Sequence, residues 1–303
     1  MISIEHDFFD WKTSMVLKPQ VTARSSLTII GLTAFLTACG GSSTESIVST
    51  APSTSKALAE VVSSNGSSST ASGGPAGQDD GQFELTFVDE FNGELDGNVW
   101  RTNRTDTESS TTNYATRNGA LKIWPQRGSN GEFFNRTLDT DGRFSQKYGY
   151  FEIEAKLPKG KGVWPAFWLF NQIGERRPEI DILEAYPGGA APWGKPDADG
   201  IPVPMMYAPV TWTDRGERAG YAKVETPDLS AGFHRYGLKW EPNRQTFYFD
   251  GREVFSHEVT VSDPLYLIVD LWFGSASGQP NDRTPTGESN AFEVNYVKAW
   301  QFK

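Results

Sequence analysis

Tyr148-Gly149-Tyr150-Phe151-Glu152-Ile153-Glu154-Ala155-Lys156-Leu157 is the stretch of the chain in which side-chain types alternate most clearly. Apolar residues occupy every second position from Phe151 to Leu157, and charged residues lie between them. Because successive side chains of a β-strand point to opposite faces, this pattern predicts a strand with one buried and one polar face. The run Pro158-Lys159-Gly160 ends the strand.

Similar short strands are predicted throughout the C-terminal part of the chain. They cover residues 83–89, 121–124, 148–157, 164–170, 179–184, 205–213, 233–240, 245–249, 253–255, 264–273 and 292–302. Long helical periodicity is missing, and the 303 residues, with 30 Gly and 18 Pro, suit a protein rich in turns. We therefore expect an all-β fold, a two-sheet antiparallel β-sandwich.

An acidic strand, Glu179-Ile180-Asp181-Ile182-Leu183-Glu184, contains the candidate catalytic residues. Glu179 and Asp181 are two residues apart and share one face, whereas Glu184 reaches that face only if a β-bulge adds a residue near Ile182 and Leu183. The two glutamate carboxyls could then approach to about 5 Å, the separation that retaining glycosidases use. The alternative is a solvated acidic strand face without a catalytic role.

Aromatic residues next to this strand are candidates for substrate binding. In the segment 164–170, Trp164 and Trp168 fall on one side, and a short loop joins the segment to the acidic strand as a hairpin. An indole offers a flat apolar face to a sugar ring, although core packing of either Trp is an equal alternative. Tyr186, after the acidic strand, and Trp272, in the segment 264–273, are further candidates for this role.

Charge restricts the class of ligand. The formal net charge is −10, and residues 1–39 contribute nothing to it because their three acidic and three basic residues cancel. Nucleic acid is therefore an unfavourable partner, a strongly sulfated or carboxylated polymer is mildly disfavoured, and a neutral polysaccharide fits best. A single Cys allows no intrachain disulfide, so stability must come from a core, which a domain of about 220 residues can supply.

The N-terminal segment has the features of an export signal. Residues 27–36 form a short apolar core, and Leu36-Thr37-Ala38-Cys39-Gly40 resembles a bacterial lipobox, in which the cysteine is acylated. We therefore expect residues 1–39 to be a lipoprotein signal peptide and Cys39 to be the site of lipid attachment. A start at Met15 would remove the acidic residues of the n-region. The alternative for Cys39 is a small buried hydrophobe.

The predicted organisation follows from this composition. Residues 40–82 are dominated by Ser, Thr, Gly and Ala and predict a flexible linker, and residues 83–303 form the folded domain. The expected protein is exported and anchored through its lipid to a bacterial membrane or to the cell surface, and Gly40 resembles an outer-membrane signal. We expect a monomer.

Residues 83–303 resemble glycoside hydrolase family 16, the group of laminarinases, agarases and carrageenases. The resemblance is carried by Phe87-Val88-Asp89-Glu90-Phe91, Tyr148-Gly149-Tyr150-Phe151-Glu152, Trp164-Pro165-Ala166-Phe167-Trp168, the acidic strand, Phe233-His234-Arg235-Tyr236-Gly237-Leu238-Lys239-Trp240 and Val294-Asn295-Tyr296-Val297-Lys298. It implies a jelly roll with a concave substrate cleft and a retaining endo-hydrolase of β-linked polysaccharide, above all β-1,3-glucan or a related glucan. It also implies that Glu179 is the nucleophile, Asp181 its electrostatic assistant and Glu184 the acid/base.

Two departures from the family bear on the substrate and on a metal. The bulged acidic motif resembles the laminarinase, agarase and carrageenase side of the family, yet residues 205–210 lack the histidine that many laminarinases carry downstream. Asn295 stands where many members have an aspartate associated with a structural calcium, so we expect no cofactor and claim no metal. The alternatives are a transglycosylase or depolymerase acting on the cell's own exopolysaccharide and a noncatalytic carbohydrate-binding lipoprotein.

Overall fold

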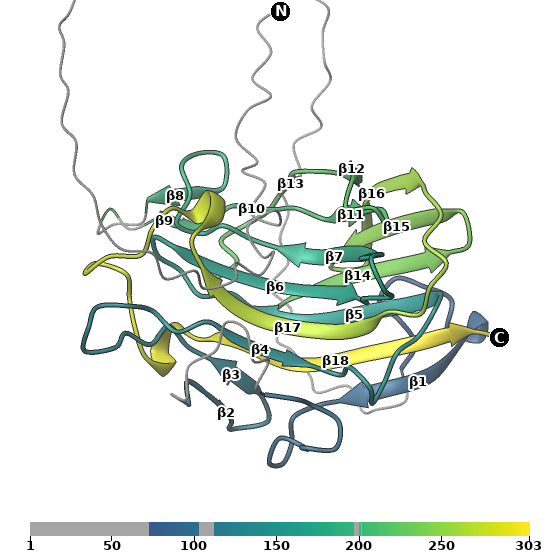
Figure 1. Ribbon diagram of the computed structural model, residues 1–303, viewed down its shortest axis with the longest axis horizontal. Coiled ribbons are helices and arrows are strands. Elements are labelled where there is room, and N and C mark those ends of the chain that lie inside the picture. The colour runs from purple at the N-terminus through teal and green to yellow at the C-terminus, as the bar shows by residue number, and fades with distance from the viewer. Residues whose placement is uncertain (1–72, 103–111, 197–199, 201) are drawn as a thin grey trace, which may run out of the picture. The chain divides into compact units, whose positions relative to one another are not determined.

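The computed structural model describes residues 73–102, 112–196, 200 and 202–303, which form two antiparallel sheets packed face to face. Figure 1 shows the course of the chain through both sheets. The eight-stranded sheet has the order β16 (Arg252–Glu258), β15 (Arg244–Phe249), β14 (His234–Glu241), β5 (Gly149–Lys156), β18 (Phe292–Phe302), β3 (Leu121–Ile123) and β2 (Tyr114–Thr116), and β1 (Phe83–Asp89) also pairs with β18. The predicted β-sandwich is confirmed.

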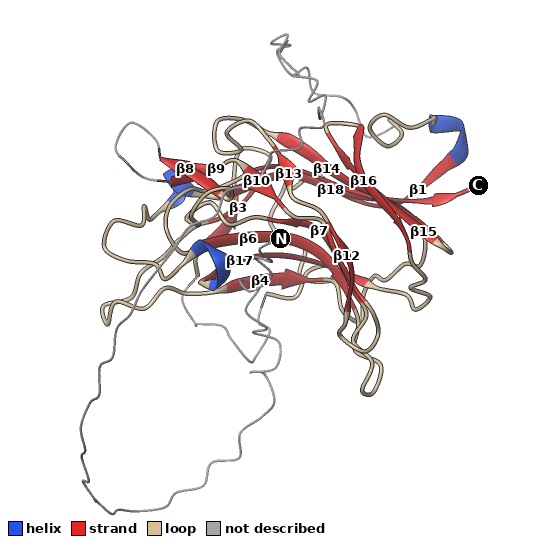
Figure 2. Ribbon diagram, turned by 90° about the horizontal axis from the view of Figure 1, so that it is seen from above, coloured by secondary structure: helices blue, strands red, loops and turns tan. Residues whose placement is uncertain are grey.

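The six-stranded sheet has the order β12 (Arg218–Tyr221), β11 (Val210–Trp212), β7 (Glu179–Glu184), β6 (Val163–Phe170), β17 (Tyr266–Phe273) and β4 (Arg136–Asp139). In Figure 2 its strands curve side by side. Two short ribbons complete the described strands: β8 (Gly194–Pro196) with β9 (Pro202–Pro204), and β10 (Met206–Tyr207) with β13 (Val224–Glu225). Short 3₁₀ turns lie at Asp80–Gln82, Ser275–Ser277 and Glu288–Asn290.

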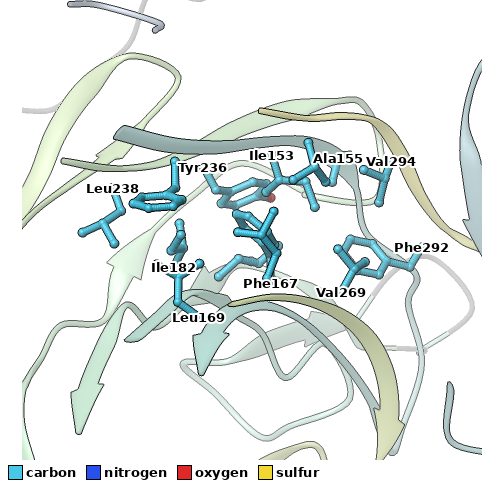
Figure 3. Packing of buried hydrophobic residues seen from close by; sticks show 14 of the residues in the cluster. Ile153, Ala155, Phe167, Leu169, Ile182, Tyr236, Leu238, Val269, Phe292 and Val294 are labelled. Atoms are coloured by element: carbon cyan, nitrogen blue, oxygen red, sulfur yellow. The ribbon is translucent and has the colours of Figure 1, made fainter. Parts of the chain in front are cut away.

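The core lies between the inner faces of the two sheets. On β5 the apolar set predicted from alternation, including Phe151, Ile153 and Ala155, is fully buried. Figure 3 shows Ile153 and Ala155 facing Phe167 of β6 and Val269 of β17 across this layer. Each large apolar side chain buried in this way contributes about 1.5–3 kcal/mol relative to exposure. Because the inner side chains of each strand are buried in this core, only the side chains on the outer faces can form a site.

Turn chemistry and proline explain the strand boundaries that differ from the sequence prediction. The hairpin between β15 and β16 turns at Asp250-Gly251, where both residues have positive φ, and β16 extends further than expected. The segment predicted as one strand over 205–213 is split into β10 and β11 because Pro209 cannot donate to a ladder. β4 escaped prediction because it buries Thr137 and Asp139 rather than an alternating apolar set.

Residues 73–82, which we expected to belong to the linker, contact the outer face of the eight-stranded sheet. The Ala76 N–H donates to Glu152 Oε2 at 3.2 Å, and the Tyr296 hydroxyl donates to Glu152 Oε1 at 2.8 Å. Gly77, with φ of 74°, approaches Gly251 so closely that a Cβ would lie 2.1 Å from the Gly251 carbonyl oxygen. We call residues 73–82 the strap. Cys39 and the rest of the predicted signal and linker lie outside the described residues.

Glu152 is only 3% exposed beneath the strap. Burial raises its pKa above the ordinary value of 4.5, although the hydrogen bonds from Tyr296 and Ala76 act in the opposite direction. The native state therefore holds the Glu152 proton more tightly than the unfolded chain does. Its contribution to the free energy of unfolding is fully present below about pH 4.5 and is lost as the pH rises through the folded pKa.

We predict that Glu152→Gln, which cannot ionise, gains stability relative to the wild type as the pH rises from about 4 to about 8. Denaturant unfolding at a series of pH values measures this difference. Glu293→Gln is the matched control, because ion pairs with Lys156 and Lys122 outweigh burial and lower the pKa of Glu293. The free energy of unfolding of the wild type should therefore rise relative to that of Glu293→Gln as the pH rises. If the free energies of unfolding of the wild type and Glu152→Gln changed equally with pH, the prediction would be contradicted.

Candidate active site

A β-bulge at Ile182 sets the orientation of the acidic strand. In the pairing of β6 with β7, Phe167 lies opposite Leu183 and Trp168 lies opposite Asp181, so Ile182 has no cross-strand partner. Ile182 and Leu183 are both buried in the core between the sheets. Two consecutive residues thus face inward, and Glu184 returns to the outer face. The bulge predicted from the spacing of the acids is confirmed.

The structure brings all three predicted acids into one pocket on the outer face of the six-stranded sheet. Glu179, Asp181 and Glu184 line this pocket and are 7%, 4% and 8% exposed. The other lining residues come from the neighbouring strands β6 and β17: Trp164, Ala166, Trp168, Asp270 and Trp272. The site is therefore built on strands of the sheet, whose inner faces are held by the core.

Tryptophan N–H groups donate to three carboxylates at this site. Trp164 Nε1 donates to Glu184 Oε1 at 3.1 Å, and Trp168 Nε1 donates to Asp270 Oδ2 at 3.0 Å. Trp212 Nε1 on β11 donates to Asp181 Oδ2 at 3.1 Å. An indole N–H is a donor only, so each bond offsets part of the cost of removing a carboxylate from water. These bonds also fix the direction in which each acid points.

The predicted substrate-binding residues occupy two different layers. Trp164, Trp168 and Trp272 line the pocket, and Trp272 Nε1 donates to Thr137 Oγ1 at 2.9 Å. Tyr186 lies behind Trp164, with ring centroids 6.0 Å apart in a stacked arrangement, and is 1% exposed. Burial, followed by the charge of Glu184 and a hydrogen bond to it, raises the pKa of Tyr186 well above its ordinary value. Contact between these side chains and substrate stays a prediction.

Sequence reasoning missed Asp270 and Trp212. Asp270 precedes Trp272 by two residues and therefore shares its face of β17, a signal that period-two counting from Trp272 would have found. Trp212 lies directly opposite Glu179 in the pairing of β11 with β7. Its register was hidden because the split of the segment 205–213 at Pro209 is not visible in the hydrophobic pattern.

The pocket has a charge of one sign. Four carboxylates line it, and no lysine or arginine is among its lining residues in the described part of the chain. The walls are otherwise mostly indole, which packs on apolar faces and donates at its edge. Away from the pocket, Asn295 donates through Nδ2 to Glu154 Oε2 at 3.0 Å. Among the described residues, no group of three or more His, Cys, Asp or Glu side chains is arranged to hold a metal ion.

Comparisons with known proteins agree with this architecture. The model of "Glycosyl hydrolases family 16" matches residues 99–298. The "Endo-1,3-1,4-beta-glycanase EglC" of Rhizobium meliloti is 29% identical over 66% of this chain and 42% of its own length. The "Glucan endo-1,3-beta-glucosidase" of Cryptopygus antarcticus is 30% identical over 73% of this chain and 93% of its own length.

Among solved structures, the laminarinase from Flavobacterium sp. UMI-01 superimposes with a TM-score of 0.60 at 25% identity. The match covers 72% of this chain and 100% of that one. This chain spans about two fifths of the length of EglC and of the related "Endo-1,3-1,4-beta-glycanase ExsH" of the same organism.

The bulge can be tested by deletion of Ile182. The shortened sequence Glu-Ile-Asp-Leu-Glu alternates without interruption, so both glutamates stay on the pocket face of an unbulged strand. We expect the deletion variant to fold, to melt at a lower temperature because it loses a buried isoleucine, and to keep detectable glycoside hydrolase activity. Thermal melts and reducing-sugar assays measure both effects.

Ile182→Ala is the matched control, because it keeps the extra residue and removes only the side chain. It should cost about 2–5 kcal/mol of stability and leave the rate of hydrolysis close to that of the wild type. A deletion variant that is folded but inactive would show that the separation of the two acids, rather than their shared face, limits the site.

Proposed function

Since this chain belongs to family 16 of the glycosyl hydrolases, we propose that it is a retaining endo-hydrolase of a neutral β-glucan, above all β-1,3-glucan. The observation that carries the proposal is the placement of Glu179, Asp181 and Glu184 on one face of β7, in a pocket walled by tryptophan. The Cryptopygus antarcticus relative supports the substrate class, because its name is glucan endo-1,3-beta-glucosidase. EglC is named an endo-1,3-1,4-beta-glycanase, which supports the β-1,3 linkage but names no sugar.

The chemistry assigns a separate task to each glutamate. The Glu179 carboxylate attacks the anomeric carbon and forms a glycosyl ester, while Glu184 gives its proton to the glycosidic oxygen as the bond to the leaving sugar breaks. Glu184 then takes a proton from water, whose oxygen attacks the same carbon and releases Glu179. Two inversions at one carbon retain its configuration. The Trp164 N–H holds one oxygen of Glu184 in place.

Asp181 acts between the two glutamates without changing covalent bonds. Its negative charge favours the protonated state of an acid beside it and stabilises positive charge that develops on the sugar ring in the transition state. When Glu179 becomes an ester, one negative charge disappears from the site, and Glu184 can more easily serve as a base. The three acids therefore work as one electrostatic unit.

Charge also supports a neutral substrate. Sulfate or uronate groups bound in the pocket would face four carboxylates without a compensating lysine or arginine in its lining. Such like-charge contacts in a poorly solvated site are costly, whereas the hydroxyl groups of a neutral glucan can donate to carboxylate oxygens. This favours a glucan over carrageenan, the sulfated alternative within the family resemblance.

The test compares the wild-type protein with Glu179→Gln on laminarin, mixed-linkage β-glucan, agarose, carrageenan and exopolysaccharide. We expect the wild type to cleave laminarin fastest and carrageenan least, and Glu179→Gln to lose at least about a thousandfold in kcat, because the nucleophile is gone. Proton NMR of the first products should show a retained β-anomer. Glu175→Gln, an exposed carboxylate ahead of β7, is the matched control and should keep full activity.

Other outcomes separate the alternatives. Inverted product would exclude Glu179 as nucleophile, and preferred cleavage of carrageenan would contradict the charge argument. Products longer than the starting oligosaccharide would identify a transglycosylase, since the acceptor is then a sugar rather than water. Binding to laminarin without cleavage of any polymer would identify a noncatalytic carbohydrate-binding protein.

We further propose, from the lipobox-like run alone, that Cys39 is acylated and that the protein is exported and anchored to a bacterial membrane. Within the described residues no helix is long and apolar enough to cross a membrane. Labelled palmitate fed to expressing cells should enter the wild type, and Cys39→Ser should abolish the incorporation. Equal labelling of the two proteins would exclude this site.

A further inference from the structure

Trp212 occupies a position from which it can reach the acidic strand without lining the pocket. In the ladder between β11 and β7, Trp212 lies opposite Glu179, and Val210 lies opposite Asp181. Diagonal neighbours of this kind are within reach of an aromatic side chain. The Trp212 indole crosses to Asp181 and donates to Oδ2 at 3.1 Å. Trp212 itself is not among the residues that line the pocket.

The packing around Trp212 holds the indole in place. Its ring, half-buried, packs against the aromatic cluster that includes Trp164, Tyr186 and Trp193. Next to it, the register of β11 against β12 shifts between Thr211 and Trp212. The indole is therefore held by its ring on one side and by a carboxylate on its nitrogen, an arrangement that restricts both partners.

We propose that Trp212 is a positioning residue that sets the orientation of Asp181 during catalysis. This inference rests on the proposed function, because Asp181 matters to the rate only if the three acids perform glycoside hydrolysis. Trp212 does not touch the reacting atoms; it acts through the one acid that keeps its charge throughout the cycle. Glu179 and Glu184 each change charge during the cycle, so Asp181 needs a partner that does not change with them.

An indole is chemically suited to this task. Its N–H donates and cannot accept, and it does not titrate in the range in which the enzyme works. The direction of the bond is thus the same when Glu179 is a carboxylate and when it is an ester. A histidine in this place could donate as well, but it would change charge near pH 6.5 and add an ionisation to the site.

The rival explanation is that Trp212 only fills space, and the chain offers a matched control for it. Trp100 Nε1 donates to Asp89 Oδ2 at 2.8 Å, the same indole–carboxylate bond. Trp100 is 1% exposed and belongs to the core between the sheets rather than to the cluster at the pocket. Trp100→Phe therefore removes an equivalent bond where a purely structural role is expected.

The first measurement needs no enzymatic activity. In a spectrum of the full protein labelled with ¹⁵N at tryptophan, the indole resonance that disappears in Trp212→Phe belongs to Trp212. Asp181→Ala should shift this resonance and speed exchange of its proton with solvent, whereas the resonance lost in Trp100→Phe should stay unchanged. A Trp212 resonance unaffected by Asp181→Ala would overturn the proposal.

The second measurement is a double-mutant cycle in kinetics. Trp212→Phe keeps an aromatic ring but loses the donor, and we expect kcat on laminarin to fall about ten- to hundredfold with little change in KM. In the Asp181→Ala background the same substitution should have almost no further effect on kcat. Trp212→His should recover part of the kcat lost in Trp212→Phe, and its pH–rate profile should show a new ionisation at about pH 6.5. Trp100→Phe should lower the melting temperature and leave kcat unchanged.

Losses that multiply in the double variant, or a loss confined to KM, would assign Trp212 to packing or to substrate contact and overturn the proposal. If the wild type cleaves no glucan, the proposed function fails, and with it the catalytic task assigned to Trp212. The indole resonance would then still establish whether Trp212 orients Asp181. Failure of the proposed function can therefore be distinguished from failure of the Trp212–Asp181 interaction.

Discussion

The pairing of β6 with β7 around the unpartnered residue Ile182 is the constraint on which the site depends. On the other side of β7, the ladder with β11 covers only Glu179, Ile180 and Asp181 and stops where the bulge begins. The next residue of the partner strand is Pro209, which has no N–H to leave unpaired there. The contact resumes with the Ala208 N–H, which donates to the Glu184 carbonyl at 2.8 Å, and with a bridge between Ala185 and Tyr207. The bulged part of β7 therefore pairs continuously only with β6, and the ladder with β11 is interrupted there.

Four nearly buried carboxylates in one pocket work against folding. Burial of a charged group costs several kcal/mol unless hydrogen bonds replace its water, and like charges nearby add to the cost. Indole N–H donors offset part of this cost, and they bring no positive charge. A lysine or arginine would stabilise the acids more strongly but would neutralise the negative charge of the pocket. The tryptophans thus reconcile a buried acidic site with a folded sheet.

Much of the fold and of the acid site could be predicted because both follow from period-two alternation. The inner face of β5 was evident from Phe151 onward, and the break in alternation at Glu184 was sufficient to predict the bulge. Features that depend on which strands are neighbours could not be predicted in the same way. Asp270 is distant in sequence from Trp168, and only the register of β17 against β6 brings them together.

Polar burial was the other limit of sequence reasoning. The segment 73–82 has a composition typical of a linker. Nothing in it indicates that Ala76 donates its backbone N–H to Glu152, which lies 76 residues later in the sequence. β4 was missed for a related reason, since its buried Asp139 is paired with Arg101, at 2.7 Å, rather than packed among apolar side chains. Hydrophobic patterns are silent where polar groups are satisfied by distant partners.

The strap has a mechanical consequence. It joins the sandwich on the outer face of the eight-stranded sheet, whereas the pocket opens on the outer face of the six-stranded sheet, on the other side of the core. Force transmitted through residues 73–82 therefore enters the domain at the face opposite the pocket, and the strands that carry the acids take no part in the strap's contacts with Glu152.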